Sequence, residues 1–332
     1  MTLDDITLTI LNSLPPELAH SIGKFFMKRK IFQPGEFTNQ NSRINLFGIN
    51  LPNPLGITAG FDKYATLQNH VQKNGFGWIE EGSFTYHGGK GNTKPRLFRT
   101  SDGGTLNRMG LNCIPAELAR ERLSQAENPF SFGVSIAKTH NEKIVGDKAI
   151  EDIINSYNLL KHLGLYTVIN ISCPNTKEGK TFEVPESFAE LHSTLTASGK
   201  NRPLLYKFSP FLDQKVLEKL VEISHDYTDG YEAVNTKPYS HPEFKKGGLS
   251  GPAIREEAKR TIKMLRKMTS KPLLGCGGIS TGQDAYAMLN AGANALLVFN
   301  GYVRKHPENP YAGRLFAHEV NQELLELKVE AL

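Results

Sequence analysis

Residues 166–176 read YTVINISCPNT, a strand-like run of six residues that passes directly into a polar loop. The run is rich in β-branched and aromatic residues, and a proline and an asparagine follow it. This composition is typical of a buried strand that ends in a turn. The stretch therefore predicts a short buried strand with polar side chains at its carboxyl end.

The same pattern occurs eight times along the chain. The runs lie at 55–59, 78–82, 132–137, 166–171, 203–208, 231–235, 272–276 and 295–299. Helix-like stretches separate them, for example at 115–126, 148–163, 213–224 and 253–268. Eight alternating strands and helices predict an α/β fold, the closed (β/α)₈ TIM barrel. A doubly wound sheet is the alternative, but no dinucleotide-type glycine-rich turn follows the first strand.

The composition is ordinary for one globular domain of 332 residues, with 39% hydrophobic and 22% charged residues. No stretch approaches the ~18 apolar residues of a membrane span, and Asp4 and Asp5 stand where a signal peptide would be basic. A net charge of +5 fits small anionic ligands or a phospholipid surface and is too scattered to indicate nucleic acid. Three cysteines without a CxxC pair indicate a reducing compartment and no metal site.

Residues 1–35 differ from the repeat and are expected to form an extension that precedes a barrel of residues 36–332. Apolar residues recur at helical spacing from Leu3 to Leu14, and again from Leu18 to Phe26. The second pattern ends among basic residues, which are Lys24, Lys28, Arg29 and Lys30. Two short amphipathic helices are predicted, the second aromatic and basic. A cap over one end of the barrel and contact with a membrane surface both fit this pattern.

Polar residues that follow the strands are candidates for function, because barrel enzymes build their sites at the carboxyl ends of the strands. Lys63 follows the first run and Lys207 ends the fifth. Single lysines at a core edge usually pair with a carboxylate, but two that converge on one barrel end suggest an anionic ligand. Glycine pairs at 247–248 and 277–278 stand around the seventh and eighth strands, where barrels commonly bind phosphate through backbone N–H groups.

Four asparagines and one cysteine follow strands as well. Asn107, Asn170, Asn175 and Asn235 offer paired donors and acceptors, which suit a planar ligand such as a pyrimidine, although any one of them alone fits a turn. Cys173 is flanked by polar residues, and a thiol there can act as a general base if its pKa is lowered. Cys113 and Cys276 are expected to be packing residues.

Several motifs together resemble dihydroorotate dehydrogenases. They are NPLG…AGFDK at 53–63, GNTKPRLFR at 91–99, NRMGLN at 107–112, NISCPNT at 170–176, NT at 235–236, GGLSG at 247–251 and GCGGIST at 275–281. GNTKPRLFR and NRMGLN are similar to the class 2, membrane-associated branch, as is LPPELAH at 14–20. The resemblance covers about residues 10–320.

The resemblance implies an FMN-binding barrel that oxidises (S)-dihydroorotate to orotate in pyrimidine biosynthesis and passes electrons to a quinone. It implies contacts to FMN from Ala59, Gly60, Lys63, Ser83, Ser135, Asn170, Lys207, Val234, Gly251, Gly278, Phe299 and Asn300. It implies substrate contacts from Lys63, Asn107, Arg108, Met109, Gly110, Leu111, Asn170, Asn175, Asn235 and Thr236. Cys173 is the implied catalytic base. Lys207 would stabilise negative charge on the flavin, and Lys63 would neutralise the substrate carboxylate.

The chain departs from the class 2 pattern at four places. Cys173 replaces a serine and is typical of soluble class 1 enzymes, Ser135 replaces an asparagine, Val234 replaces a threonine, and KEGK follows Thr176. Another dihydropyrimidine or a soluble acceptor therefore stays as an alternative, and a non-catalytic FMN-binding barrel is a third. Class 2 membership implies a peripheral membrane protein on the cytoplasmic face of the inner membrane, held through residues 1–32. If the extension is only a cap, the protein is expected to be cytoplasmic.

Overall fold

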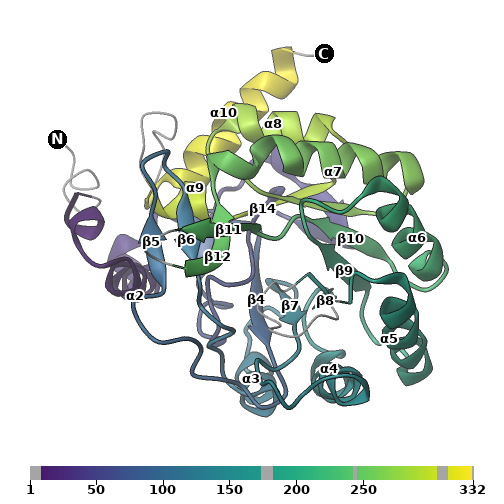
Figure 1. The fold of residues 1–332 in the computed structure, drawn as a ribbon. Coiled ribbons are helices and arrows are strands. Elements are labelled where there is room, and N and C mark those ends of the chain that lie inside the picture. Colours follow the sequence, from purple (N-terminus) through teal and green to yellow (C-terminus); the bar gives the residue numbers. More distant parts are fainter. Residues whose placement is uncertain (1–8, 173–181, 242–244, 305–312, 331–332) are drawn as a thin grey trace.

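Eight parallel strands close into a barrel in the computed structural model of the chain, which describes residues 9–172, 182–241, 245–304 and 313–330 (Figure 1). The strands are β3 (Leu55–Ile57), β4 (Trp78–Phe84), β7 (Phe132–Ile136), β8 (Thr167–Asn170), β9 (Leu204–Phe208), β10 (Gly230–Ala233), β13 (Leu273–Cys276) and β14 (Ala295–Val298). Each pairs with the next, and β14 pairs with β3. All eight predicted strands are confirmed, and the doubly wound alternative is excluded.

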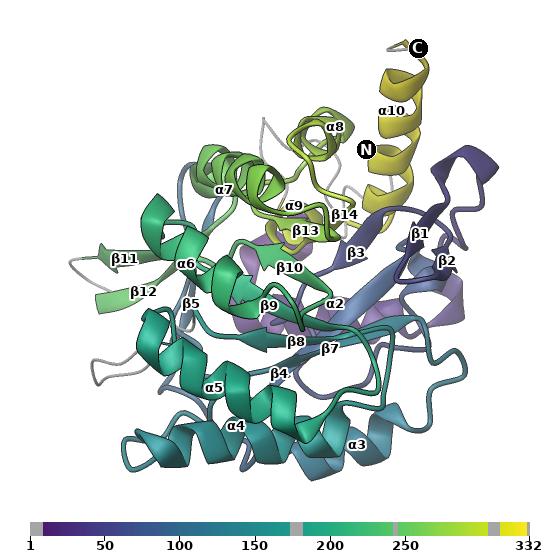
Figure 2. The same cartoon turned by 90° about the vertical axis from the view of Figure 1, so that its right-hand side faces the viewer.

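Helices cover the outside of the barrel, as Figure 2 shows for α3 to α8. They are α3 (Ala116–Leu123), α4 (Asp147–Leu160), α5 (Pro185–Ser198), α6 (Gln214–Ser224), α7 (Arg255–Met268) and α8 (Gly282–Asn290), followed by α9 (Asn300–Val303) and α10 (Phe316–Glu330). Each of the outer helices buries an apolar stripe against the strands. On α6 that stripe includes Leu217, Leu220 and Val221, which recur at the i, i+3, i+4 spacing of an amphipathic helix.

A hairpin of β1 (Ile44–Leu46) and β2 (Ile49–Leu51) adds apolar residues to the inner core of the barrel. Leu46 and Leu51 are buried in one cluster with Trp78 and Tyr166. The Phe47 ring packs edge-on against Tyr166, with 5.9 Å between the ring centroids. Four short 3₁₀ turns complete the described structure, at Lys30–Phe32, Gln40–Ser42, Gln72–Asn74 and Pro252–Ile254.

A second, four-stranded antiparallel sheet was not predicted. It consists of β5 (Leu97–Arg99), β6 (Thr105–Asn107), β11 (Lys237–His241) and β12 (Lys245–Ser250), in the order β11-β12-β6-β5. Figure 1 shows this sheet on the same side of the barrel as α2 (Pro16–Met27). Residues of the sheet and of α2 therefore stand near the same end of the barrel.

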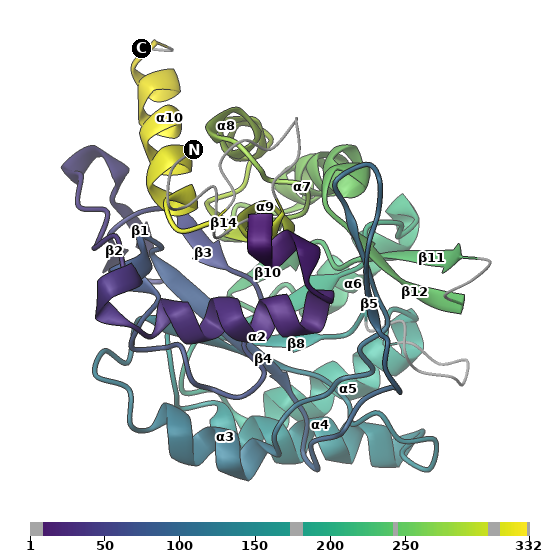
Figure 3. The same cartoon turned by 90° about the vertical axis from the view of Figure 1, so that its left-hand side faces the viewer.

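The helix α2 lies across this end of the barrel, with β5 beside it (Figure 3). Arg99 of β5 donates hydrogen bonds to the carbonyls of Leu11 and Leu14, at 3.0 and 2.7 Å. Lys24 of α2 forms an ion pair with the buried Asp62. The second predicted helix is confirmed, while the first is described only from residue 9, where residues 9–13 are helical. No helix in the described part of the chain is long and apolar enough to cross a membrane.

Candidate active site

One cavity of about 730 Å³ opens between α2, the second sheet and the carboxyl ends of the barrel strands. Among the described residues that line it, Glu17 is the only acid, and seven are basic: Lys24, Lys28, Lys63, Lys94, Arg96, Arg122 and Lys207. Such an excess of positive charge attracts anionic ligands and is focused by the low-dielectric walls of a cleft.

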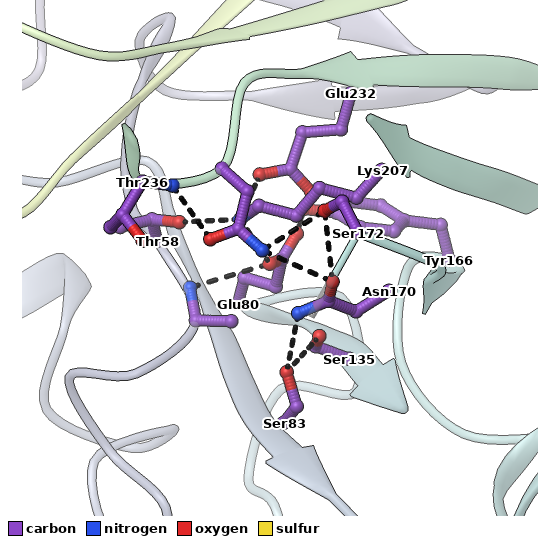
Figure 4. Close-up of polar contacts among 12 residues, drawn as sticks. Thr58, Glu80, Ser83, Ser135, Tyr166, Asn170, Ser172, Lys207, Glu232 and Thr236 are labelled. Atoms are coloured by element: carbon purple, nitrogen blue, oxygen red, sulfur yellow. Dashed lines mark hydrogen bonds and ion pairs between the residues drawn. The ribbon is translucent and has the colours of Figure 1, made fainter. Parts of the chain in front are cut away.

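Lys207 is the most deeply placed cation of this cavity, and only 4% of its surface is exposed. Its Nζ lies 2.5 Å from Glu232 Oε1 and 3.7 Å from Glu80 Oε1, and it donates a 3.2 Å hydrogen bond to Thr58 Oγ1 (Figure 4). Burial disfavours the charged form of Lys207. Attraction to the two carboxyl groups outweighs the effect of burial and raises the pKa of Lys207. Lys207 therefore carries a permanent positive charge.

Hydroxyl and amide groups form a second layer beside Lys207, which Figure 4 shows. Asn170 Oδ1 accepts hydrogen bonds from Ser172 Oγ at 3.1 Å and from Asn235 Nδ2 at 3.2 Å. Asn235 Nδ2 also donates to Ser172 Oγ at 2.9 Å, and its Oδ1 accepts from the Thr236 N–H. The Thr236 contact fixes which way the Asn235 amide points, so the network presents defined donors and acceptors.

Lys63 is the second lysine of the predicted site and lies at a different wall of the cavity. Its Nζ donates a 3.0 Å hydrogen bond to Asn112 Oδ1. Burial, together with repulsion from Arg96, lowers the pKa of Lys63 to about 8. An anionic group bound beside Lys63 would favour the charged form further, so this position suits a carboxylate ligand.

Glycines line the far part of the cavity. Gly251, Gly277 and Gly278 have φ angles of +101°, +129° and +72°, a region that residues with a Cβ rarely adopt. A Cβ on Gly278 would lie 2.6 Å from the Cβ of Arg255, so the backbone is closely packed there. The backbone N–H groups of such a turn suit a phosphate.

The helix α2 contributes an aromatic contact that the sequence alone did not predict. His20 stacks on Phe299 with a centroid distance of 5.8 Å, and its Nε2 lies 2.8 Å from the Phe61 carbonyl. Burial lowers the pKa of His20 to about 4, so the ring is neutral. Because a carbonyl only accepts, Nε2 carries the proton and Nδ1 is left as an acceptor.

The structure gathers most of the predicted site residues around this one cavity. The lining includes Ala59, Gly60, Lys63, Ser83, Asn107, Met109, Gly110, Leu111, Asn170, Lys207, Val234, Asn235, Thr236, Gly251, Gly278, Phe299 and Asn300. Cys173 and Asn175 lie outside the described residues. The individual roles of all these residues stay predictions.

Two predicted contact residues lie outside the lining. Ser135 forms a 2.8 Å hydrogen bond with Ser83 Oγ and is fully buried. The backbone of Arg108 is engaged by neighbours, since its N–H donates to the Arg96 carbonyl and its own carbonyl accepts from Asn92. The predicted ligand contacts of Ser135 and Arg108 stay predictions.

The fold and the cavity define a (β/α)₈-barrel protein with a mainly cationic cavity at the carboxyl ends of the strands. The family model described as "Dihydroorotate dehydrogenase" matches residues 42–327. The chain belongs to the dihydroorotate dehydrogenase family.

Similar proteins agree with this membership. The "Dihydroorotate dehydrogenase (quinone)" of Natronomonas pharaonis is 34% identical over 86% of this chain and 81% of its own length. That of Halobacterium salinarum is 33% identical over 96% of this chain and 93% of its own. The crystal structure of DHODH from Eimeria tenella in complex with ferulenol matches this structure with a TM-score of 0.83 and 26% sequence identity. The match covers 97% of this chain and 95% of the Eimeria tenella chain. The resemblance derived from the sequence motifs is thereby confirmed.

Proposed function

We propose that this chain oxidises dihydroorotate to orotate in pyrimidine biosynthesis, with FMN as its flavin and a quinone as electron acceptor. The observation that carries the proposal is the buried, charged Lys207 in a cavity lined by the predicted substrate and flavin residues. The relatives named above as quinone enzymes support the choice of acceptor.

The donor set of the cavity fits a flavin mononucleotide. A buried cation stands at one end, hydroxyls and amides stand beside it, and glycine backbone lines the other part. Lys207, Ser83, Asn170 and Ala59 would hold the ring system, and the backbone around Gly251, Gly278 and Asn300 would hold the phosphate. When bound, the flavin supplies the acceptor for the two electrons of the substrate, while the protein contributes position and charge.

Other side chains would bind the substrate and remove its proton. Lys63 would neutralise the substrate carboxylate, and Asn107, Asn170 and Asn235 would bind the polar edges of the pyrimidine. Cys173 would take the proton from C5 of dihydroorotate. The chain reaches Cys173 directly after Ser172, which is hydrogen bonded to Asn170 and Asn235 in the cavity wall.

The acceptor is proposed to enter beside α2, through the extension of residues 1–35. His20, Lys24 and Phe25 line the cavity from this helix. Several apolar side chains of the same region face solvent, namely Ile10, Leu18, Phe25 and Ile31, with Ile31 83% exposed. Arg29 stacks over Phe25, and Lys28 and Lys30 lie close by in the sequence. An apolar and basic surface of this kind fits peripheral contact with a membrane that contains quinone.

A truncated protein that begins at Glu36 is expected to keep flavin reduction by dihydroorotate and to lose turnover with quinone. The reason is that the truncation removes the α2 wall of the cavity and leaves every barrel strand in place. Full-length protein should also bind anionic liposomes weakly and lose this binding in salt, since each nearby cation contributes about 1 kcal/mol. Stopped-flow reduction of the flavin and steady-state turnover with quinone should be measured on the same truncated preparation. The first assay then serves as the control for the second, because it shows that the barrel is still active. Unchanged quinone kinetics in the truncated protein would show that residues 1–35 are only a cap.

A further inference from the structure

Glu232 is a buried acid in the barrel interior that the proposed chemistry does not use. It stands on β10 in register with Lys207 on β9, and its side chain is fully buried. Register partners of parallel strands point to the same face, so both side chains enter the barrel (Figure 4). The ammonium of Lys207 lies closer to Glu232 than to Glu80, at 2.5 Å against 3.7 Å. One cation therefore faces two carboxyl groups.

The charge of this cluster depends on Glu232. The groups that face it are Lys207 from β9, Glu80 from β4, Cys276 from β13 and Tyr166 just before β8. Burial and repulsion from Glu80 raise the pKa of Glu232 well above its ordinary value, although Lys207 opposes this shift. Burial also raises the pKa of the Cys276 thiol to about 11 and raises that of Tyr166, so both stay neutral. Among these groups, Glu232 is the carboxyl group whose pKa is raised.

We propose that Glu232 sets the reduction potential of the bound flavin by offsetting the positive charge of Lys207. This proposal rests on the proposed flavin site. Glu232 does not line the cavity, so it acts through Lys207 and does not touch the ligand. A cation beside a flavin favours the negatively charged reduced form, and a carboxylate beside that cation weakens the effect. Ionisation of Glu232 adds one negative charge beside Lys207, and its protonation removes that charge.

Glu232→Gln keeps the size of the side chain and removes its charge. The midpoint potential of the flavin should be measured by anaerobic redox titration of the full-length holoprotein at several pH values. At alkaline pH the variant should have the higher potential, with a ratio of reduced to oxidised flavin at least about tenfold larger, which is about 30 mV for two electrons. The difference should shrink as the pH falls, because protonated wild-type Glu232 then resembles glutamine.

The wild-type protein offers a second measurement that does not depend on a variant. Over the pH range in which Glu232 titrates, reduction should take up an additional proton, so the potential should fall about 30 mV per pH unit more steeply. Glu81→Gln is the matched control. Glu81 is equally buried and next along β4, but it faces Asp62 and Lys24, so its substitution should not move the potential.

Equal potentials for wild type and Glu232→Gln between about pH 6 and about pH 9.5, or a shift shared with Glu81→Gln, would overturn the proposal. Those outcomes leave the proposed function intact, because the flavin is still bound and reduced. Wild-type protein that takes up no flavin would instead refute the proposed function itself.

Discussion

Cys173→Ala is expected to slow reduction of the flavin by dihydroorotate by about 10²–10⁴-fold while the flavin stays bound, because general base catalysis contributes a factor of this size. The reference pKa of a thiol, about 8.5, lies far closer to neutrality than that of a serine hydroxyl, so Cys173→Ser should retain more activity with an optimum at higher pH. Anaerobic stopped-flow absorbance against pH measures both variants.

Two neighbouring side chains are less suited than Cys173 to act as the base. Ser172 is hydrogen bonded to both Asn170 and Asn235, so its hydroxyl is already engaged. Cys276 lines the cavity, but burial raises the pKa of its thiol to about 11. Cys113→Ala is the matched control, since it removes a buried thiol from outside the lining and should leave the rate unchanged. Flavin reduction by Cys173→Ala within a few-fold of wild type would remove Cys173 from the mechanism.

Lys207→Met is expected to lower the free energy of unfolding by about 3–5 kcal/mol and to weaken flavin binding. Removal of one partner from a buried ion pair leaves an uncompensated charge, and here two carboxyl groups, Glu80 and Glu232, lose their cation. Urea unfolding of the flavin-free protein measures the stability, and fluorescence titration with FMN measures the affinity.

Lys219→Met provides the matched control for this substitution. Lys219 forms an exposed ion pair with Glu222, at 3.0 Å, so its loss should change stability by no more than about 0.5 kcal/mol. A double variant, Lys207→Met with Glu232→Leu, should recover part of the stability because one unpaired acid is gone. If Lys207→Met unfolds at the same urea concentration as wild type, the buried cluster does not stabilise the barrel.

The barrel could be predicted from the sequence because each of its strands is a compact apolar run and helix-like stretches separate most of these runs. The second sheet could not be predicted in the same way. Its strands β5 and β6 have three residues each, too few to show alternation, and β6 pairs with β12, which lies about 140 residues away in the sequence. Pairing at that separation depends on the closed barrel that brings the two segments together.

The candidate site, like the fold, could be predicted from the sequence only in part. Lys63 and Asn235 follow barrel strands, and Asn170 and Lys207 stand at or next to the carboxyl ends of theirs, so their position in the sequence placed them at the cavity. Glu80 and Glu232 stand inside strands, and only the register of the closed barrel reveals that both face Lys207. The contacts of α2, such as Lys24 with Asp62 and His20 with Phe299, depend on how a separate helix packs on the barrel. No local spacing encodes such contacts.

The most direct test of the proposed function follows the flavin of full-length protein through both half-reactions. The purified protein should release FMN on denaturation, and anaerobic dihydroorotate should bleach the bound flavin. A short-chain quinone should then restore the absorbance, while NAD⁺ and fumarate should not. A flavin that dihydroorotate fails to bleach, or that recovers with NAD⁺ or fumarate and not with quinone, would contradict the account.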